Sequence, residues 1–277
     1  MDILLNELSL DGQFTDKDIF LDNLENLLYT IKVIEQLKFS LLKDYSFFNS
    51  QVTNSESFIE IAQSKDNRVR KLKSFLLRLS NNPPFWNTEQ EHNCSDNSYI
   101  FNSNNICETS LAESCERDKF ILSFKHNDYL EYNLLIKKNT NKINLYNILD
   151  RNLFLDYIFN LDKIIPLEYC KLRFKNTNLD FTLLDEITGF NLLNKKQVKE
   201  YISSFIKFSL MEWINIDNDV GFQYKPYTGD IFKKTKYAMK NIKKFRTSQL
   251  YRCFGYRQEN IFYVIQFEIN HKISDNG

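Results

Sequence analysis

The sequence has 277 residues, of which 43% are hydrophobic and 26% are charged, and its formal net charge is zero. This composition is typical of a globular protein and excludes both a collagen-like chain and an intrinsically disordered one. No apolar run reaches the roughly 18 residues that indicate a membrane span. Because the acidic N-terminal segment has few basic side chains, we expect no secretory signal, no membrane association and a cytoplasmic location.

Motifs for the common cofactors are missing from the sequence. It has no G-x4-G-K-[ST], no G-x-G-x-x-G, no H-E-x-x-H and no G-x-S-x-G pattern. We therefore expect no cofactor. The histidines are His92, His126 and His271, so few residues are available for histidine-based proton transfer. His126 is most simply interpreted as a turn residue.

Five cysteines are spread unevenly through the chain, at positions 94, 107, 115, 170 and 253. Their simplest interpretation is reduced structural thiols, because a chain of this length needs no disulfides to fold. An alternative groups His92, Cys94, Cys107 and Cys115 as zinc ligands, since thiolate and imidazole suit that ion. The spacing, H-x-C-x12-C-x7-C, lacks the paired C-x2-C of typical zinc sites. The main expectation is therefore that no metal is bound.

Two amphipathic helices are predicted near the N-terminus. Hydrophobic residues recur at spacings of three and four from Asp16 to about Asp44, with Thr15 or Asp16 as the N-cap, and again from about Asp66 to Ser80. Residues 81–108 are polar and lack periodicity, which predicts a long loop. The aromatic residues within this loop, such as Trp86, are expected to pack onto the protein.

A small sheet is predicted to follow the loop. We expect a short helix at Ser110–Glu116, then strands at Phe120–Phe124 and Tyr132–Ile136 that form a hairpin through Lys125–Asp128. The segment Leu149–Leu161 could be a helix or a strand, because its apolar spacing is mixed. A proline and a later polar segment favour a boundary near residue 165, which gives domains at 1–165 and 166–277.

The C-terminal domain is expected to combine helices with a hairpin. Periodicity predicts a helix at Lys195–Trp213 and a basic helix at Lys233–Lys244. Strands are expected at Gln249–Arg257 and Ile261–Ile269, around a polar turn. Overall we predict an α+β fold, with N-terminal helices and a small sheet, followed by a C-terminal helix and a twisted antiparallel sheet.

The C-terminal fifth of the chain concentrates positive charge. Between Ile231 and Lys272 there are ten Lys or Arg residues but only two acids, Glu259 and Glu268. Aromatic residues are interleaved with these cations, at positions 237, 245, 251, 254, 256, 262 and 263. Cations pair with phosphates and aromatic rings stack on unpaired bases, so the pattern favours a flexible polyanion as a ligand. The alternative is a solvated basic helix followed by a hairpin whose aromatic residues form a core.

The C-terminal order of elements resembles that of a known family. A basic helix, Arg246, a strand with Arg252 and Arg257, a turn, an apolar strand and then His271-Lys272 are similar to the C-terminal half of RelE-type and HigB-type toxins. These toxins are small messenger-RNA-cleaving ribonucleases that pair with antitoxins. The resemblance covers about 45 residues.

The resemblance implies cleavage without a metal, in which the RNA 2′-hydroxyl attacks the adjacent phosphate. Arg252, Tyr256, His271 and Lys272 are the catalytic residues that it implies. Lys243, Lys244, Arg246 and Arg257 are the implied nucleic-acid-binding residues. Guanidinium groups suit these roles because they hold phosphate through two hydrogen bonds and stabilise charge on its oxygens. RNA, the ribosome and an antitoxin are the implied partners of such a toxin or phage-defence effector.

Two other classes of function fit the same residues. The protein could be a non-catalytic accessory subunit whose basic face binds nucleic acid or an acidic protein. It could also be a structural protein of a mobile element, in which case the arginines serve stability alone. Binding that weakens as salt rises, without RNA cleavage, would indicate the accessory function.

Overall fold

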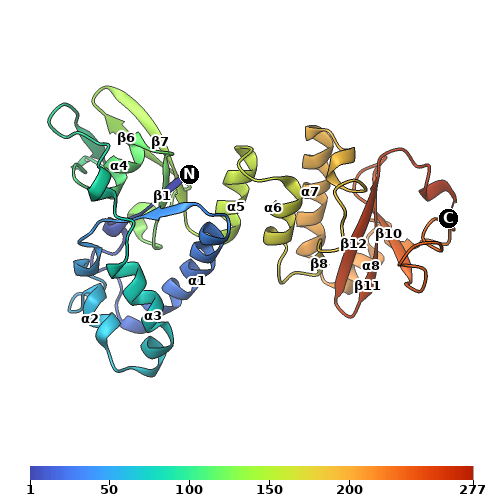
Figure 1. Ribbon diagram of the computed structural model, residues 1–277, viewed down its shortest axis with the longest axis horizontal. Coiled ribbons are helices and arrows are strands. Elements are labelled where there is room, and N and C mark those ends of the chain that lie inside the picture. Colours follow the sequence, from blue (N-terminus) through green and yellow to red (C-terminus); the bar gives the residue numbers. More distant parts are fainter. Residues whose placement is uncertain (277) are drawn as a thin grey trace. The chain divides into compact units, whose positions relative to one another are not determined.

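The computed structural model describes residues 1–276 and has an α+β fold, as predicted (Figure 1). The helices and strands of this part of the chain build two mixed sheets, one of seven strands and one of five. The chain divides into two compact units, which we call the N-terminal unit (residues 1–157) and the C-terminal unit (from Ile158). Neither sheet is purely antiparallel, and the N-terminal sheet is larger than the sequence indicated.

The N-terminal sheet has a parallel half and an antiparallel half. Its strand order is β2-β1-β5-β7-β6-β3-β4. The strands β2, β1, β5 and β7 pair in parallel, whereas β7, β6, β3 and β4 pair in antiparallel fashion. The bounds are β1 Asp2–Leu5, β2 Ser40–Leu42, β3 Tyr99–Phe101, β4 Asn104–Asn105, β5 Phe120–Leu122, β6 Asn133–Lys138 and β7 Asn141–Ile148.

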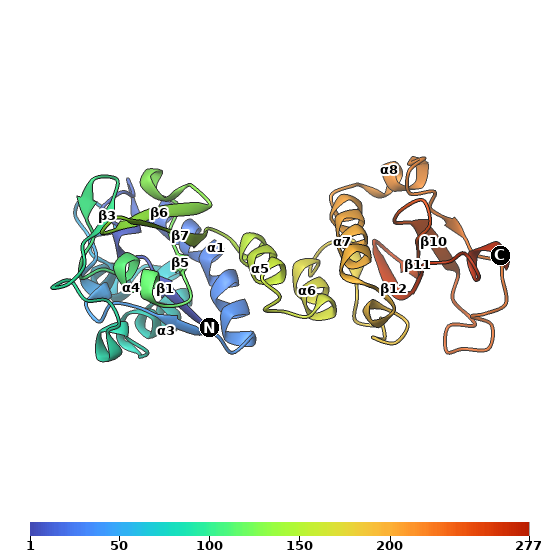
Figure 2. The same cartoon turned by 90° about the horizontal axis from the view of Figure 1, so that it is seen from above.

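The N-terminal helices pack on both faces of this sheet. They are α1 Lys17–Gln36, α2 Phe58–Gln63, α3 Asn67–Asn81 and α4 Ser110–Glu116. Leu4 of β1 and Ile121 of β5 share a core with Leu111 of α4. On the other face, the ring of Phe20 from α1 packs against Phe124, which follows β5, with centroids 5.7 Å apart. Figure 2 shows α1 and α4 with the strands between them.

The first helix ends earlier than its periodicity predicts. Asp16 caps it as expected, accepting a hydrogen bond from the backbone N–H of Ile19. The helix stops at Gln36, however, because Lys38 has a positive φ of 57° and the chain turns into β2. The apolar residues of β2 continue the helical spacing by coincidence, but they pair with β1 instead.

The predicted hairpin between β5 and β6 is wrong. Strand β7, which the sequence analysis missed, lies between them and pairs with both. His126 lies in the connection from β5 and caps a short 3-10 helix, Asn127–Tyr129, so its expected turn position is confirmed. The predicted loop at 81–108 contains β3 and β4, and the side chain of Trp86 is buried as expected.

Helix α5 (Arg151–Asn160) contains the division between the units, which therefore falls before the expected boundary near residue 165. The first half of α5 belongs to the N-terminal unit, because Phe154 packs against Phe39 and the Tyr157 hydroxyl donates to the Tyr132 carbonyl oxygen at 2.6 Å. Pro166 is the first residue of α6 (Pro166–Arg173), where its ring suits a helix start.

The C-terminal sheet has the order β8-β12-β11-β10-β9. Its strands are β8 Leu179–Asp180, β9 Lys225–Pro226, β10 Ile242–Arg246, β11 Arg252–Gln258 and β12 Ile261–Glu268. The β11–β12 hairpin was predicted, and β8 adds a parallel edge. The helix predicted from Lys195 to about Trp213 is α7 (Lys195–Ser209), which ends earlier than expected, and a separate helix, α8 (Trp213–Asn218), begins where the prediction ended.

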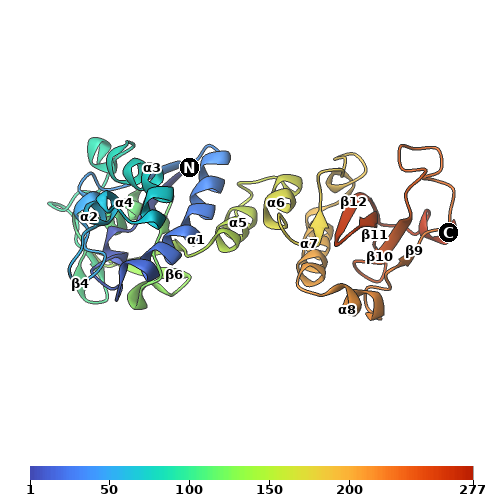
Figure 3. The ribbon, with the colours of Figure 1, turned by 90° about the horizontal axis from the view of Figure 1, so that it is seen from below.

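Aromatic side chains fill both faces of this sheet. Helix α7 covers one face, where Tyr201 packs on Phe267 at 4.4 Å and Phe208 on Phe245 at 4.6 Å between ring centroids. On the other face, Phe232 and Tyr227 pack against Phe254. Figure 3 shows α7 on one side of β12, β11 and β10.

The basic helix predicted at Lys233–Lys244 does not form. Residues 233–241 are a series of turns, and Ile242–Arg246 is strand β10. The Thr235 side chain accepts from the backbone N–H of Tyr237 and donates to the Phe232 carbonyl, which favours turns over a helix. Within residues 1–276, no helix has the length and apolar character needed to cross a bilayer.

Candidate functional site

The predicted basic residues occupy two neighbouring strands. Lys243, Lys244 and Arg246 lie on β10, and Arg252 and Arg257 lie on β11. Arg246 is directly opposite Arg252 in the antiparallel pairing. Arg257 is five residues further along β11, a distance of about 17 Å for an extended strand. The three arginines therefore do not form one group.

Arg252 has a structural role in the turn before its own strand. Its Nη1 atom donates hydrogen bonds to the carbonyl oxygens of Ser248, Gln249 and Tyr251, at 3.2, 3.2 and 2.9 Å. Burial, and then the adjacent charge of Arg246, lower the pKa of Arg252 below its usual range. The guanidinium holds the segment between β10 and β11 in place, so replacing it would disturb the fold as well as the binding of any ligand.

Three of the predicted residues line one small pocket. Lys244, Arg252 and His271 surround a volume of about 100 Å³, together with Gln223, Lys225, Ser274 and Asp275. Lys244 Nζ donates to the Ser274 carbonyl oxygen at 2.8 Å, and His271 Nδ1 lies 3.1 Å from the Ser274 hydroxyl. We call this the Lys244 pocket. It is smaller than the several hundred Å³ that are typical of sites for drug-sized ligands.

Tyr256 and Arg257 lie outside the Lys244 pocket. The Tyr256 ring is buried and stacks on Tyr263 with centroids 5.3 Å apart. Burial, and then Tyr263, raise the pKa of the Tyr256 hydroxyl. The Arg257 guanidinium stacks on the Trp213 ring, 3.8 Å from its centroid, and lies 3.7 Å from Asp217. Lys272 is exposed and does not line the pocket.

The expected stacking of bases on the C-terminal aromatic residues is not available to most of these rings. Phe245, Phe254 and Phe262 have no exposed surface, since they form the cores on the two faces of the sheet. The alternative interpretation is therefore confirmed for these aromatic residues, which form a core, but its solvated basic helix does not form.

A much larger groove runs along α7, and the sequence analysis did not anticipate it. We call this volume of about 1160 Å³ the α7 groove. Arg246 lines it together with three lysines of α7, a run of polar residues after β10 and the apolar side chains of Leu210, Met211 and Phe222. The lining cations are Lys196, Lys199, Lys207 and Arg246, and the lining acids are Glu200 and Asp219. Arg246 Nε is buried and has no hydrogen-bond partner in the described part of the chain.

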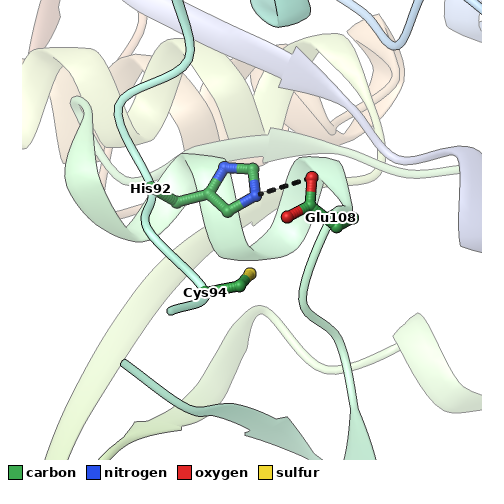
Figure 4. A group of neighbouring side chains, drawn as sticks. All are labelled: His92, Cys94 and Glu108. Atoms are coloured by element: carbon green, nitrogen blue, oxygen red, sulfur yellow. Dashed lines mark ion pairs between the residues drawn. The ribbon is translucent and has the colours of Figure 1, made fainter. Parts of the chain in front are cut away.

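A second candidate site lies in the N-terminal unit. A nitrogen of His92, the sulfur of Cys94 and a carboxylate oxygen of Glu108 all lie within 4.8 Å of one another. Figure 4 shows the three side chains pointing toward a common centre from two chain segments. His92 Nε2 is 3.8 Å from Glu108 Oε2. An open pocket of about 510 Å³ gives solvent access to this cluster.

The other two cysteines of the predicted zinc set have different positions. Cys107 lies beside Cys94 and contributes to the raised pKa of the Cys94 thiol, but its sulfur is outside the set of atoms within 4.8 Å of one another and lies 3.9 Å from the Asn97 carbonyl oxygen. Cys115 lies within α4, where its thiol is buried and donates to the Leu111 carbonyl oxygen at 3.3 Å. Glu108 therefore occupies the place that the sequence spacing gave to Cys115. In the sequence, the only feature that marks Glu108 is its position directly after Cys107.

A buried carboxylate holds His92 in place. Glu113 Oε2 lies 2.6 Å from His92 Nδ1, and Glu113 Oε1 accepts from Arg117 Nε at 2.6 Å. The same carboxylate accepts hydrogen bonds from the backbone N–H groups of Glu91 and His92. Although burial alone would raise the pKa of Glu113, the hydrogen bonds from His92 and Arg117 lower it to about 2.

Glu7 is another buried carboxyl that the sequence did not reveal. It follows β1, at the carboxyl end of the parallel strands, where α/β sheets commonly bind ligands. Its Oε1 accepts from the Ser110 N–H at 2.9 Å, but Oε2 is buried without a partner within residues 1–276. Burial raises the pKa of Glu7 to about 7.

Comparisons of the chain with protein-family models, with curated proteins and with solved structures found no match. The resemblance to RelE-type and HigB-type toxins therefore stays a prediction from the order of residues. The site geometry carries the functional argument.

Proposed function

We propose that the protein binds single-stranded RNA along the α7 groove, mainly through the phosphate backbone. Four cations line the groove against two acids, together with hydroxyl and amide side chains and the apolar Leu210, Met211 and Phe222. Cations and polar donors in a long groove suit a flexible polyanion, which can bend to meet each of them. RNA is preferred over DNA because of the toxin resemblance.

The observation that carries this proposal is Arg246, which lines the groove and whose Nε has no hydrogen-bond partner within residues 1–276. Because Nε itself is buried, the side chain must turn for this atom to reach a ligand. A buried N–H group without an acceptor costs roughly 1–3 kcal/mol, and more when the group is charged. A phosphate oxygen is the acceptor that a guanidinium fits best, since two N–H groups can reach two oxygens. Binding of the RNA backbone would thus give the Arg246 Nε–H group an acceptor and remove the free-energy cost of leaving it without one.

Replacing Arg246 by alanine should weaken the binding of a single-stranded RNA by about 10-fold, because one charge-assisted contact is lost. The slope of log affinity against log salt should also fall by about 0.7 for each phosphate contact removed. Fluorescence anisotropy with a labelled RNA at several salt concentrations measures both quantities. Lys234→Ala is the matched control, since Lys234 is exposed and does not line the groove.

RNA binding through the groove is refuted if the wild-type affinity does not depend on salt. It is equally refuted if Arg246→Ala and Lys234→Ala bind RNA alike. A double variant, Lys199→Ala with Lys207→Ala, repeats the test on α7 without touching the sheet.

A second proposal is that RNA is cleaved at the Lys244 pocket. His271 is the one imidazole that lines this pocket, beside the cations of Lys225, Lys244 and Arg252. In such a reaction the 2′-hydroxyl loses its proton and attacks the adjacent phosphorus, and the 5′-oxygen leaves with a proton. The cations would stabilise charge on the phosphate, and His271 would move a proton.

His271→Ala tests cleavage better than Arg252→Ala does, because Arg252 also holds a turn. We expect wild-type expression in cells to slow growth and fragment transcripts, and His271→Ala to do neither. Lys236→Ala is the control, since Lys236 is exposed and does not line the pocket. Normal growth with the wild type, together with RNA left intact by the purified protein on and off ribosomes, would eliminate the ribonuclease proposal while leaving RNA binding open.

A further inference from the structure

The His92 cluster in the N-terminal unit is independent of the groove and calls for an explanation of its own. Its members come from two segments, residues 92–94 before β3 and residues 107–108 before α4. An imidazole nitrogen and a carboxylate oxygen approach each other there, with 3.8 Å between His92 Nε2 and Glu108 Oε2. A cation bound to both atoms would make use of this approach.

The hydrogen bonds around His92 fix the orientation of its ring. Glu113 Oε2 lies 2.6 Å from Nδ1, and a carboxylate bonded to Arg117 acts as an acceptor, so Nδ1 carries the proton. The amide nitrogen of Gln90, which can only donate, lies 3.2 Å from Nε2 and 3.1 Å from the His92 carbonyl oxygen. With Nδ1 donating to Glu113, Nε2 is the ring nitrogen left to accept, and the Gln90 amide occupies it.

This arrangement is typical of a histidine that binds a metal. Metal-bound histidines commonly donate their other ring N–H to a carboxylate, which fixes the ring and makes it a stronger ligand. Burial strengthens the argument, because the side chains of His92 and Glu113 have no exposed surface. The carboxylate is thus built into the fold, whereas a surface pair could form by chance.

The donor set and its dimensions match zinc. Zinc binds thiolate sulfur at about 2.3 Å, and imidazole nitrogen and carboxylate oxygen at about 2.0–2.2 Å, in tetrahedral geometry. Ligand atoms of such a site are about 3.3–3.8 Å apart. The atoms of His92, Cys94 and Glu108 already lie within 4.8 Å of one another, so small side-chain rotations complete the geometry. A mixed set with sulfur excludes magnesium and calcium, which prefer oxygen.

We propose that His92 Nε2, Cys94 Sγ, Cys107 Sγ and one carboxylate oxygen of Glu108 bind a single Zn²⁺. The ion would tie the segment before β3 to the segment before α4, and the Gln90 amide would move aside. With four protein ligands the site is a structural one. This inference departs from the expectation that no metal is bound, and it does not depend on RNA binding.

The test measures zinc bound to the purified full-length protein. Elemental analysis after dialysis should give one zinc per chain for the wild type and for Cys115→Ser, the control for a cysteine outside the cluster. Cys94→Ser and Glu108→Gln should bind zinc at least 10-fold more weakly in a competition with a chromophoric chelator. Circular dichroism establishes that each variant is folded.

Cobalt substitution identifies the thiolate ligands. Co²⁺ bound to the wild type should give a thiolate-to-metal charge-transfer band, which Cys94→Ser and Cys107→Ser should each reduce by about half, since each removes one of two thiolates. A folded wild type that binds no zinc, or a Cys94→Ser variant with wild-type zinc affinity, overturns the site. An unchanged cobalt band in Cys107→Ser overturns the assignment of the fourth ligand.

Discussion

Replacement of Glu113 by glutamine should lower the free energy of unfolding of the N-terminal unit by about 3–5 kcal/mol, because it breaks a buried pair with Arg117, which then keeps only Asp2 and Glu91 as acidic partners. The Glu113 side chain has no exposed surface, and Arg117, whose Nε lies 2.6 Å from it, is only 8% exposed. Glutamine has the same shape but no charge, so the variant isolates the electrostatic contribution. Chelator is present throughout, so that a bound metal cannot add to the difference.

Urea denaturation followed by circular dichroism measures this loss. Glu35→Gln is the matched control, since Glu35 forms an ion pair with Arg78 in which both side chains are about half exposed. Exposed pairs contribute about 0–1 kcal/mol, so this control should differ little from the wild type. A loss of less than about 1 kcal/mol in Glu113→Gln would mean that the buried contacts of Glu113 do not stabilise the fold.

The same carboxylate predicts a loss of stability in acid. The pKa of Glu113 is lowered from 4.5 to about 2 by folding, so the stabilisation is present above pH 4.5. It should disappear as the pH falls from 4.5 to 2, because the unfolded chain then binds a proton that the folded chain excludes. The wild type should therefore lose stability over this range more steeply than Glu113→Gln does.

Replacement of Gly255 by alanine should destabilise the C-terminal unit by about 3 kcal/mol or more, because there is no room for a side chain. A Cβ atom at this position would lie 2.2 Å from the Tyr263 carbonyl oxygen and 2.6 Å from the Phe262 ring. The carbonyl belongs to the backbone of β12, so it cannot rotate away. The register shift between Phe254 and Gly255 marks the same close approach.

Amide hydrogen exchange shows where stability is lost. In Gly255→Ala, protection should fall in β10, β11 and β12, while β1, β5 and β7 of the other unit keep theirs. Gly221→Ala is the control, since a Cβ there meets only the flexible Asp219 side chain, at 3.0 Å. Equal exchange in the two alanine variants would show that the hairpin yields without cost and would refute the prediction.

Local sequence patterns correctly predicted the elements whose own residues favour the observed structure. Asp66 caps α3 as well as preceding its apolar stripe, and Ser110–Glu116 forms a helix with the predicted bounds. The C-terminal hairpin combines aromatic and β-branched residues with a polar turn, which is a strong strand pattern. In each of these cases, propensity and burial favour the same structure.

Elements that depend on distant partners could not be predicted in this way. Strand β7 contains three asparagines and a lysine, which are poor strand formers, and it exists because β5 and β6 pair with it on either side. The segment Ile242–Arg246 resembles the end of a basic helix in sequence. It becomes a strand because Ile242 and Phe245 are buried against the rest of the sheet.

The same distinction between local and distant determinants applies to the residues of the candidate sites. The sequence predicted the cations of β10 and β11, but the groove depends on lysines of α7, whose spacing marks only the helix face opposite the core. His92, Cys94 and Cys107 were predicted as one alternative. Glu108 and the orienting Glu113 could not be found from spacing, because a turn with a positive φ at Glu108 and the start of α4 bring them there.

The two tryptophans lie in different units, with Trp86 in the first and Trp213 in the second. Trp86 is buried and donates its indole N–H to the Ser110 hydroxyl, whereas Trp213 is partly exposed beneath the Arg257 guanidinium. Their emission should therefore differ in wavelength, since an indole in an apolar environment emits further to the blue. Each unit therefore contains an intrinsic fluorescent probe. Replacing one tryptophan by phenylalanine removes its emission, so each unit can be followed separately without an attached dye.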